Sequence, residues 1–161
     1  MDFRVGFGYD SHRFAPGRPL VIGGIVVPYE LGLAAHSDGD VLIHAVCDAL
    51  LGAAGLKDIG TWFPDTDAAY KNADSTILLA KVVELVHGKG WEVNNLDCTL
   101  VLERPKMKPH IDDIIAKLSQ LLATPAENIA VKAKTNEKMG FTGAGEGIAA
   151  MAAVTLRSPN P

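Results

Sequence analysis

Residues 41–56 read VLIHAVCDALLGAAGL, and this apolar segment constrains the fold of the chain more than any other. Only His44 and Asp48 interrupt it, and it is shorter than the ~20 apolar residues that a membrane span requires. We therefore predict a helix buried inside the protein. Ser37 or Asp38 is a good N-cap for it, and Gly55 offers a stop after about Ala54.

The segments on either side of this helix mix the two periodicities. Residues 3–14 alternate as a strand does, and 20–27 resemble a hairpin around Gly23 and Gly24. Helical spacing returns at 74–88, capped by Asp74 or Ser75, and at 110–122. Further strands are expected at 93–102, 129–134 and 148–156, with a loop of the lid type at 60–71 and a Gly-rich turn at 143–147.

This order of elements predicts a single α+β domain over residues 1–161, in which a single-layer β-sheet is covered by helices on one face. A chain of this length buries a core without disulfides or a structural metal. The other face of the sheet must meet something. The apolar first and last strands favour self-association.

Composition excludes several classes of protein. The net charge of −4 leaves no basic footprint for non-specific nucleic-acid binding. The two cysteines, Cys47 and Cys98, have neither metal-ligand spacing nor a disulfide pattern. No signal or transit segment and no membrane span stands out, so we expect a cytoplasmic protein; a plastid origin with a removed transit peptide stays open.

Three residues form a candidate metal site. Asp10 and His12 lie two apart on a predicted strand, so both side chains point to one face. Taken alone, such a pair is more often a surface hydrogen bond. His44 has Asp40 and Asp48 one helical turn to either side, and taken alone it is more often a core histidine held by Asp48.

Together, Asp10, His12 and His44 match a catalytic zinc site, because two imidazoles and a carboxylate leave one coordination position open. Asp48 is then expected to orient the ring of His44. The residues before the helix, His36 and Ser37, lie near its free amide groups, where a phosphate oxygen can bind in addition to ordinary capping.

A second polar group precedes the Gly-rich turn. It comprises Lys132, Lys134, Thr135, Glu137 and Lys138. The plain interpretation is a solvated turn. The glycine spacing matches neither a P-loop nor a dinucleotide-binding motif.

Five motifs in order along the chain resemble the family of 2-C-methyl-D-erythritol 2,4-cyclodiphosphate synthases. They are GYDSH at 8–12, AHSDGDVLIHAVCDALLGAAGLKDIG at 35–60, FPDTD at 63–67, RPKMKPHI at 104–111 and KTNEKMGFTGAGEG at 134–147. The resemblance implies a homotrimer with active sites between subunits. It also implies a phosphorus–oxygen lyase of the non-mevalonate route to isoprenoid precursors, acting on 4-diphosphocytidyl-2-C-methyl-D-erythritol 2-phosphate and releasing CMP.

The same resemblance implies residue roles. Zinc is assigned to Asp10, His12 and His44, a second cation, magnesium or manganese, to Glu137, and transition-state contacts to His36 and Thr135. Substrate-binding positions are Ser37, Asp58, Ile59, Gly60, the mobile loop Phe63, Pro64, Asp65, Thr66 and Asp67, then Leu102, Glu103, Arg104, Pro105, Lys106, Met107, Lys108, Lys134, Asn136 and Phe141.

Two positions depart from the family pattern. Ala144 stands where many members carry Arg, and Met151 where some carry Glu. In members with both, that pair lines a central cavity that accepts isoprenoid diphosphates. We therefore predict weak or no binding of such compounds here.

Two alternatives to the synthase remain at this point. One is a metal-dependent phosphoesterase that delivers water instead of an internal phosphate. The other is a trimer that stores metal or acts as a scaffold without turnover. Thr135 and Glu137 separate these, because a pure metal binder has no need of them.

Overall fold

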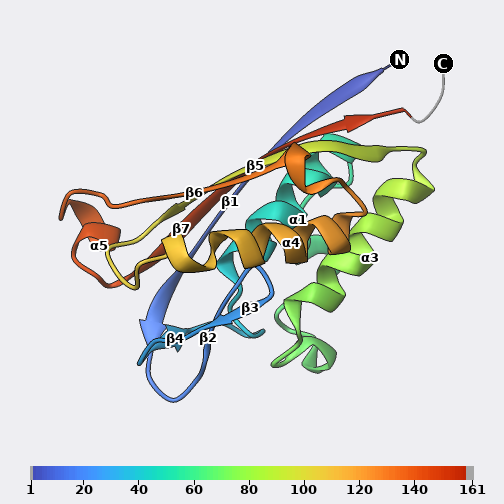
Figure 1. Ribbon diagram of the computed structural model, residues 1–161. Helices are drawn as coiled ribbons and strands as arrows, with labels where there is room; N and C mark the ends of the chain where they lie inside the picture. Colours follow the sequence, from blue (N-terminus) through green and yellow to red (C-terminus); the bar gives the residue numbers. More distant parts are fainter. Residues whose placement is uncertain (1, 159–161) are drawn as a thin grey trace.

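The structure is a computed structural model and describes residues 2–158. Its main sheet has five strands in the order β4-β1-β7-β5-β6 (Figure 1). β5 and β6 run parallel, whereas β1 is antiparallel to both β4 and β7, and β5 to β7. The strands are β1 (Phe3–Ala15), β4 (Gly32–Leu33), β5 (Glu92–Val101), β6 (Ile129–Lys134) and β7 (Gly147–Arg157). A separate hairpin pairs β2 (Leu20–Ile22) with β3 (Ile25–Val27).

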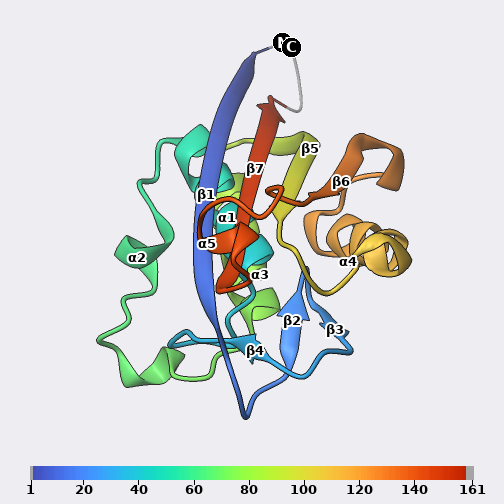
Figure 2. The ribbon, with the colours of Figure 1, turned by 90° about the vertical axis from the view of Figure 1, so that its left-hand side faces the viewer.

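Three long helices lie on one side of this sheet, as Figures 1 and 2 show. They are α1 (Val41–Ala54), α3 (Ser75–Gly88) and α4 (Ile111–Leu122). The predicted α+β arrangement with helices over one face is confirmed. Within the described residues, no helix is long and apolar enough to cross a membrane.

Two glycines of β1 set how closely α1 packs on the sheet. A Cβ atom on Gly6 would lie 1.9 Å from the carbonyl oxygen of Ala49, and one on Gly8 would lie 1.9 Å from that of Ala45. No side chain fits there, so the helix backbone rests directly on the strand. Asp10 and His12 continue the same face of β1. The close packing therefore brings them beside His44 of α1.

The N-terminus of α1 differs from the prediction. Asp40, not Ser37 or Asp38, is the N-cap, and its Oδ1 accepts a hydrogen bond from the backbone of Ile43 at 3.0 Å. The same carboxylate accepts from the backbone of Gly23 at 2.9 Å and of Gly24 at 2.6 Å. Complete burial of Asp40 is the main cause of its raised pKa, about 6, although these three bonds lower it. The start of α1 is thus tied to the β2–β3 turn.

Most other predicted elements are present with small shifts in their ends. Asp74 caps α3 as expected, and Gly55 ends α1 with a positive φ of 72°. The segment 60–71 is not a structureless loop, because Asp58 and Asp67 cap short turns in it. The short elements that the sequence did not reveal are β4, α2 (Ile59–Trp62), η1 (Ala68–Tyr70), η2 (Lys108–His110), η3 (Ala126–Asn128) and α5 (Gly140–Gly143).

The face of the sheet opposite the long helices exposes large apolar side chains. They alternate along β1 with the glycines that contact α1. Their exposed fractions are 57% for Phe3, 74% for Val5, 65% for Phe7 and 51% for Tyr9. A contiguous apolar strand surface of this kind is typical of an interface with another chain.

Candidate active site

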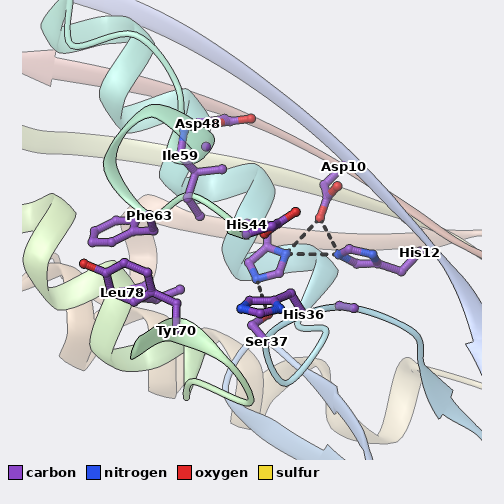
Figure 3. A pocket seen from close by; sticks show the side chains of 13 residues that line it. Asp10, His12, His36, Ser37, His44, Asp48, Ile59, Phe63, Tyr70 and Leu78 are labelled. Carbon is purple, nitrogen blue, oxygen red and sulfur yellow. Dashed lines mark hydrogen bonds and ion pairs between the residues drawn. The ribbon is translucent and has the colours of Figure 1, made fainter. Parts of the chain in front are cut away.

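Three potential ligand atoms meet where β1 faces α1. Asp10 Oδ2 lies 2.8 Å from His12 Nε2 and 3.0 Å from His44 Nδ1, and the two histidine nitrogens are 3.1 Å apart (Figure 3). Ligands about 2.0–2.1 Å from a tetrahedral zinc ion lie about 3.3 Å from one another. A divalent cation therefore fits this group with only a small spreading of the ligands, and the predicted convergence of the three residues is confirmed.

The electrostatics of the group also suit a cation. Burial, the largest single effect, opposes ionisation of Asp10, but hydrogen bonds and charges of His12 and His44 outweigh it and lower its pKa to about 2. Burial likewise opposes a charged His44, yet the hydrogen bond and charge of Asp10, with the charges of Asp40 and Asp38, raise the pKa of His44. The group thus attracts positive charge, either a proton or a metal ion.

The second nitrogen of His44 faces two serines. Nε2 lies 3.0 Å from Ser75 Oγ and 3.1 Å from Ser37 Oγ. The prediction that Asp48 orients this ring is wrong, because Asp48 Oδ1 instead accepts a hydrogen bond from the backbone of Ile59 at 2.8 Å. In Figure 3 Asp48 lies beside Ile59, away from the His44 ring. Sequence reasoning missed Ser75, whose only signal was its place at the start of a predicted helix.

The metal group opens into a cavity of about 370 Å³. Figure 3 shows the rings of Phe63 and Tyr70 on one side of it and the imidazoles on the other. The two aromatic rings pack edge to face with centroids 5.3 Å apart. The lining comprises Asp10, His12, Ala35, His36, Ser37, His44, Asp48, Ile59, Gly60, Phe63, Asp65, Tyr70 and Leu78. Ala35, Tyr70 and Leu78 were not predicted, and Asp48 was predicted only as a residue that orients His44.

Four predicted residues of this region do not line the cavity. Asp58 caps α2 by accepting from the backbone of Thr61 at 2.8 Å. Asp67 accepts from the backbone of Ala69 at 2.9 Å, and its carbonyl oxygen lies 3.3 Å from His36 Nε2. Pro64 and Thr66 are exposed between them.

A second cavity of about 340 Å³ lies at the ends of β5 and β6. It shares no lining residue with the first. Its lining comprises Leu102, Glu103, Pro105, Lys106, Met107, Lys108, Ile111, Ala133, Lys134 and Thr135. Arg104, Asn136, Glu137 and Phe141 lie outside that lining, and Phe141 borders a smaller cavity with Ser11, His12, Arg13 and Glu146.

The turn after β6 is held by Glu103. Glu103 Oε1 accepts from the backbone of Asn136 at 3.0 Å and of Lys138 at 3.4 Å. The turn contains two left-handed residues in succession, Glu137 with a φ of 49° and Lys138 with a φ of 62°. Such backbone is costly for residues other than glycine and needs support of this kind. The turn directs the hydroxyl of Thr135 toward Glu137 Oε1, at 3.0 Å.

The two polar groups found in the sequence are therefore separate within one chain. Among the described residues, the group close enough to share a metal ion consists of Asp10, His12 and His44, without Glu137.

Comparison with known proteins identifies the relatives of this chain. The model of the YgbB family matches residues 3–157. A 2-C-methyl-D-erythritol 2,4-cyclodiphosphate synthase of Bacillus cytotoxicus is 57% identical over 155 residues, which are 96% of this chain and 98% of the relative. The enzyme of the same name from Bacillus mycoides is 56% identical with the same coverage.

Solved structures of synthases with the same name are also similar to this chain. A 2C-methyl-D-erythritol-2,4-cyclodiphosphate synthase in a CDP-bound form is 40% identical, with a TM-score of 0.88 over 96% of this chain and 100% of its own. The CDP complex of IspF from Plasmodium falciparum is 32% identical, with a TM-score of 0.86 over 98% of this chain and 97% of its own. The bifunctional IspDF from Campylobacter jejuni is 41% identical, with a TM-score of 0.94 over 98% of this chain but only 42% of its own length.

Proposed function

Since the chain belongs to the YgbB family, whose relatives are 2-C-methyl-D-erythritol 2,4-cyclodiphosphate synthases, we propose that the cavity beside Asp10, His12 and His44 is where ring closure takes place. The enzyme converts 4-diphosphocytidyl-2-C-methyl-D-erythritol 2-phosphate to 2-C-methyl-D-erythritol 2,4-cyclodiphosphate and CMP, in the non-mevalonate route to isoprenoid precursors. The observation that carries the proposal is the convergence of three metal-ligand atoms in the lining of a cavity of about 370 Å³.

The reaction is an internal phosphoryl transfer. An oxygen of the 2-phosphate forms a bond to the β-phosphorus of the diphosphate, and the bond from that phosphorus to the bridging oxygen breaks, so CMP leaves with the oxygen. A phosphate monoester has a second pKa of about 6, so the attacking group is already ionised at neutral pH and needs no strong base. The difficulty is the approach of one anion to another.

Charge neutralisation answers this difficulty. When bound, zinc at Asp10, His12 and His44 and magnesium or manganese near Glu137 offset the phosphate charge and favour an in-line arrangement of the oxygens. The ligand set of two imidazoles and one carboxylate, with a carboxylate already ionised by its surroundings, suits the first ion.

Residues around the cavity hold the sugar phosphate in its ring-closing shape. Ser37, Asp58, Ile59 and Gly60 bind that part of the substrate. The loop Phe63, Pro64, Asp65, Thr66 and Asp67 covers it and excludes water, which protects the product from hydrolysis. His36, beside the loop carbonyl of Asp67, donates to the transferring phosphoryl group.

The cytidine and the α-phosphate occupy the second cavity. Lys106, Lys108 and Lys134 line it and supply positive charge. Thr135 donates to the transition state from the turn that Glu103 holds. Besides these lysines, the residues proposed to contact the nucleotide part of the substrate are Leu102, Glu103, Arg104, Pro105, Met107, Asn136, Glu137 and Phe141. A relative with the same fold has been solved with CDP bound, which supports the proposal that this chain binds a cytidine nucleotide.

We further propose a homotrimer in which each active site joins the first cavity of one subunit to the second cavity of its neighbour. One substrate must reach both cavities, yet they share no lining residue within a chain. The exposed apolar side chains of β1, on the face without long helices, supply an interface.

Product analysis tests the reaction. Incubation with the diphosphocytidyl substrate should release CMP and the cyclic diphosphate, whereas His44→Ala should lose both the metal and turnover. CMP with only a linear product would establish a phosphoesterase instead. Thr135→Ala should keep its metal content while turnover falls, and this outcome would exclude a metal-storing scaffold.

A further inference from the structure

His44 has polar partners on both ring nitrogens. Nδ1 faces Asp10 Oδ2 at 3.0 Å, and Nε2 faces the hydroxyl oxygen of Ser75 at 3.0 Å. A neutral imidazole carries one proton, on either nitrogen. Only the nitrogen without the proton can bind a metal, so the partner of Nε2 decides whether His44 is a competent ligand.

The hydroxyl proton of Ser75 already has an acceptor. Ser75 Oγ donates to Asp38 Oδ1 at 2.5 Å, and the backbone N–H of Ser75 donates to Asp38 Oδ2 at 3.0 Å. Ser75 is completely buried, with an exposed fraction of 0%. Since its proton lies toward Asp38, the oxygen can only accept from His44 Nε2. A proton of His44 is therefore held on Nε2, so that in the neutral ring Nδ1 carries none and can bind a metal.

Asp38 is itself fixed in place. Its Oδ1 also accepts from the backbone of Asp40 at 3.1 Å, and its own N–H donates to the carbonyl of Ala73 at 3.1 Å. The contact with Ala73 joins the segment before α1 to the segment before α3. Turning the carboxylate away from Ser75 would break its bonds to the backbone N–H groups of Asp40 and Ser75.

Ser37 also lies near Nε2, but it plays a different part. Its Oγ is 3.1 Å from Nε2 and accepts from the backbone of Gly39 at 3.3 Å. Ser37 borders the first cavity, and Figure 3 shows it close to the ring of His44. Ser75 does not line that cavity. Its bond to His44 is thus independent of what the cavity contains.

We propose that Asp38 and Ser75 are positioning residues that hold the proton of His44 on Nε2 and aim Nδ1 at the metal. The relay runs from Asp38 through the Ser75 hydroxyl to the imidazole. It rests on the proposed function only in that Asp10, His12 and His44 bind a divalent cation.

Titration with Co²⁺ alone tests the relay, because the visible absorption of bound Co²⁺ reports both affinity and ligand geometry without substrate. The metal-free full-length chain is compared with Ser75→Ala and Asp38→Asn. Removing such partners of a metal-binding histidine weakens metal affinity by about 10- to 100-fold, and we expect this for Ser75→Ala. Ser75→Thr keeps the hydroxyl and should recover most of the affinity.

Thr76→Ala is the matched control. Thr76 lies in the same first turn of α3 and bonds to Asp74 at 2.7 Å, at the exposed surface. Thr76→Ala should leave Co²⁺ affinity within about threefold of wild type. This result would distinguish loss of the Ser75 hydroxyl from a general destabilisation of the start of α3. An equally small change for Ser75→Ala, with His44→Ala losing binding, would overturn the proposal.

A second measurement needs no variant. In the Zn²⁺-loaded wild type with ¹⁵N-labelled histidine, His44 should show a proton bonded to Nε2 and none to Nδ1. The opposite pattern refutes the relay even if Ser75→Ala does not fold. If wild type makes no cyclic product while Ser75→Ala still loses Co²⁺ affinity, the proposed function fails and the relay stands.

Discussion

The two cavities differ in how firmly one chain builds them. The metal group is set by backbone packing, because Gly6 and Gly8 let α1 rest on β1 and fix three ligand atoms 2.8 to 3.1 Å apart. The second cavity lies beside an exposed turn that depends on hydrogen bonds to one carboxylate, that of Glu103.

The metal group is thus preorganised within the chain, whereas the second cavity is the part that the proposed trimer would complete with a neighbouring subunit. Preorganised groups stabilise a transition state without reorganisation during the reaction. A substrate that arrives at the interface can then be clamped between a rigid half and an adjustable one.

The largest effect on the rate of CMP release is expected when either the metal group or the turn after β6 loses one residue. His44→Ala removes a metal ligand and should lower the rate of CMP release by about a thousandfold, since charge stabilisation worth several kcal/mol is lost. Thr135→Ala removes one donor to the transition state and should cost about a hundredfold or more. Steady-state CMP assays with the same excess of Zn²⁺ and Mg²⁺ in every sample measure both rates.

Co-expression of the two variants tests whether each active site is shared between subunits. If each site combines the metal half of one subunit with the nucleotide half of the next, a random mixture of co-expressed variants should recover about a quarter of wild-type activity, because most trimers then contain one intact site. If both halves act within one chain, the mixture will show no more activity than the average of the two variants.

Next in size is the effect of adding a methyl group where α1 meets the sheet. Gly8→Ala places a Cβ 1.9 Å from the carbonyl oxygen of Ala45, so the free energy of unfolding should fall by about 3 kcal/mol and metal affinity should fall with it. Gly52→Ala is the control, since a Cβ there meets nothing within 4 Å and the helix gains up to about 1 kcal/mol. If denaturant unfolding gives Gly8→Ala and Gly52→Ala the same free energy of unfolding, the close packing of α1 on β1 does not contribute to stability.

A smaller effect should appear in the pH dependence of metal binding. The pKa of His44 is raised, so below that raised value a proton occupies the ligand and the metal must displace it. The His44 proton should therefore lower Zn²⁺ affinity by about tenfold for each pH unit below the pKa of His44, and this contribution disappears above it. Asp10, with a pKa of about 2, stays ionised throughout and adds nothing to the slope. Competition titrations between pH 5.5 and 8 measure this, and a flat profile would contradict it.

The sequence was informative where a local pattern determines position. Alternation along β1 placed Asp10 and His12 on one face, and the apolar stretch 41–56 predicted α1 with His44 inside. It was less informative where partners come from distant segments. Ser75 and Asp38 are 37 residues apart in sequence, and Asp48 satisfies a backbone group of a turn whose path no local pattern reveals.

The same limit explains the N-cap error. Ser37, Asp38 and Asp40 are all good capping residues, and the choice among them depends on the β2–β3 turn, which needs the carboxylate of Asp40. Short elements such as α5 escaped for a related reason: four residues are too few for a periodic pattern.

The smallest expected effect is the binding of an isoprenoid diphosphate at the sheet face without long helices. Met151 pairs with Tyr9 and Thr99 on this face, and Ala144 is exposed at the end of α5, so neither offers a charge to a diphosphate. Arg13, on the same face of β1, lies 3.6 Å from Glu146, which offsets its charge. We therefore expect isothermal titration of the assembled protein with an isoprenoid diphosphate to show weak binding or none.

Introducing the arginine that many family members carry at position 144 gives a second test of this prediction. Ala144→Arg should gain affinity for the isoprenoid diphosphate by about tenfold, the worth of one charge-assisted contact, while CMP release stays at the wild-type rate because neither cavity includes this position. Saturable binding to the wild type that is abolished by blocking the central cavity of the proposed trimer would contradict the prediction. It would mean that the apolar surface alone, without a fixed positive charge, suffices to hold the ligand.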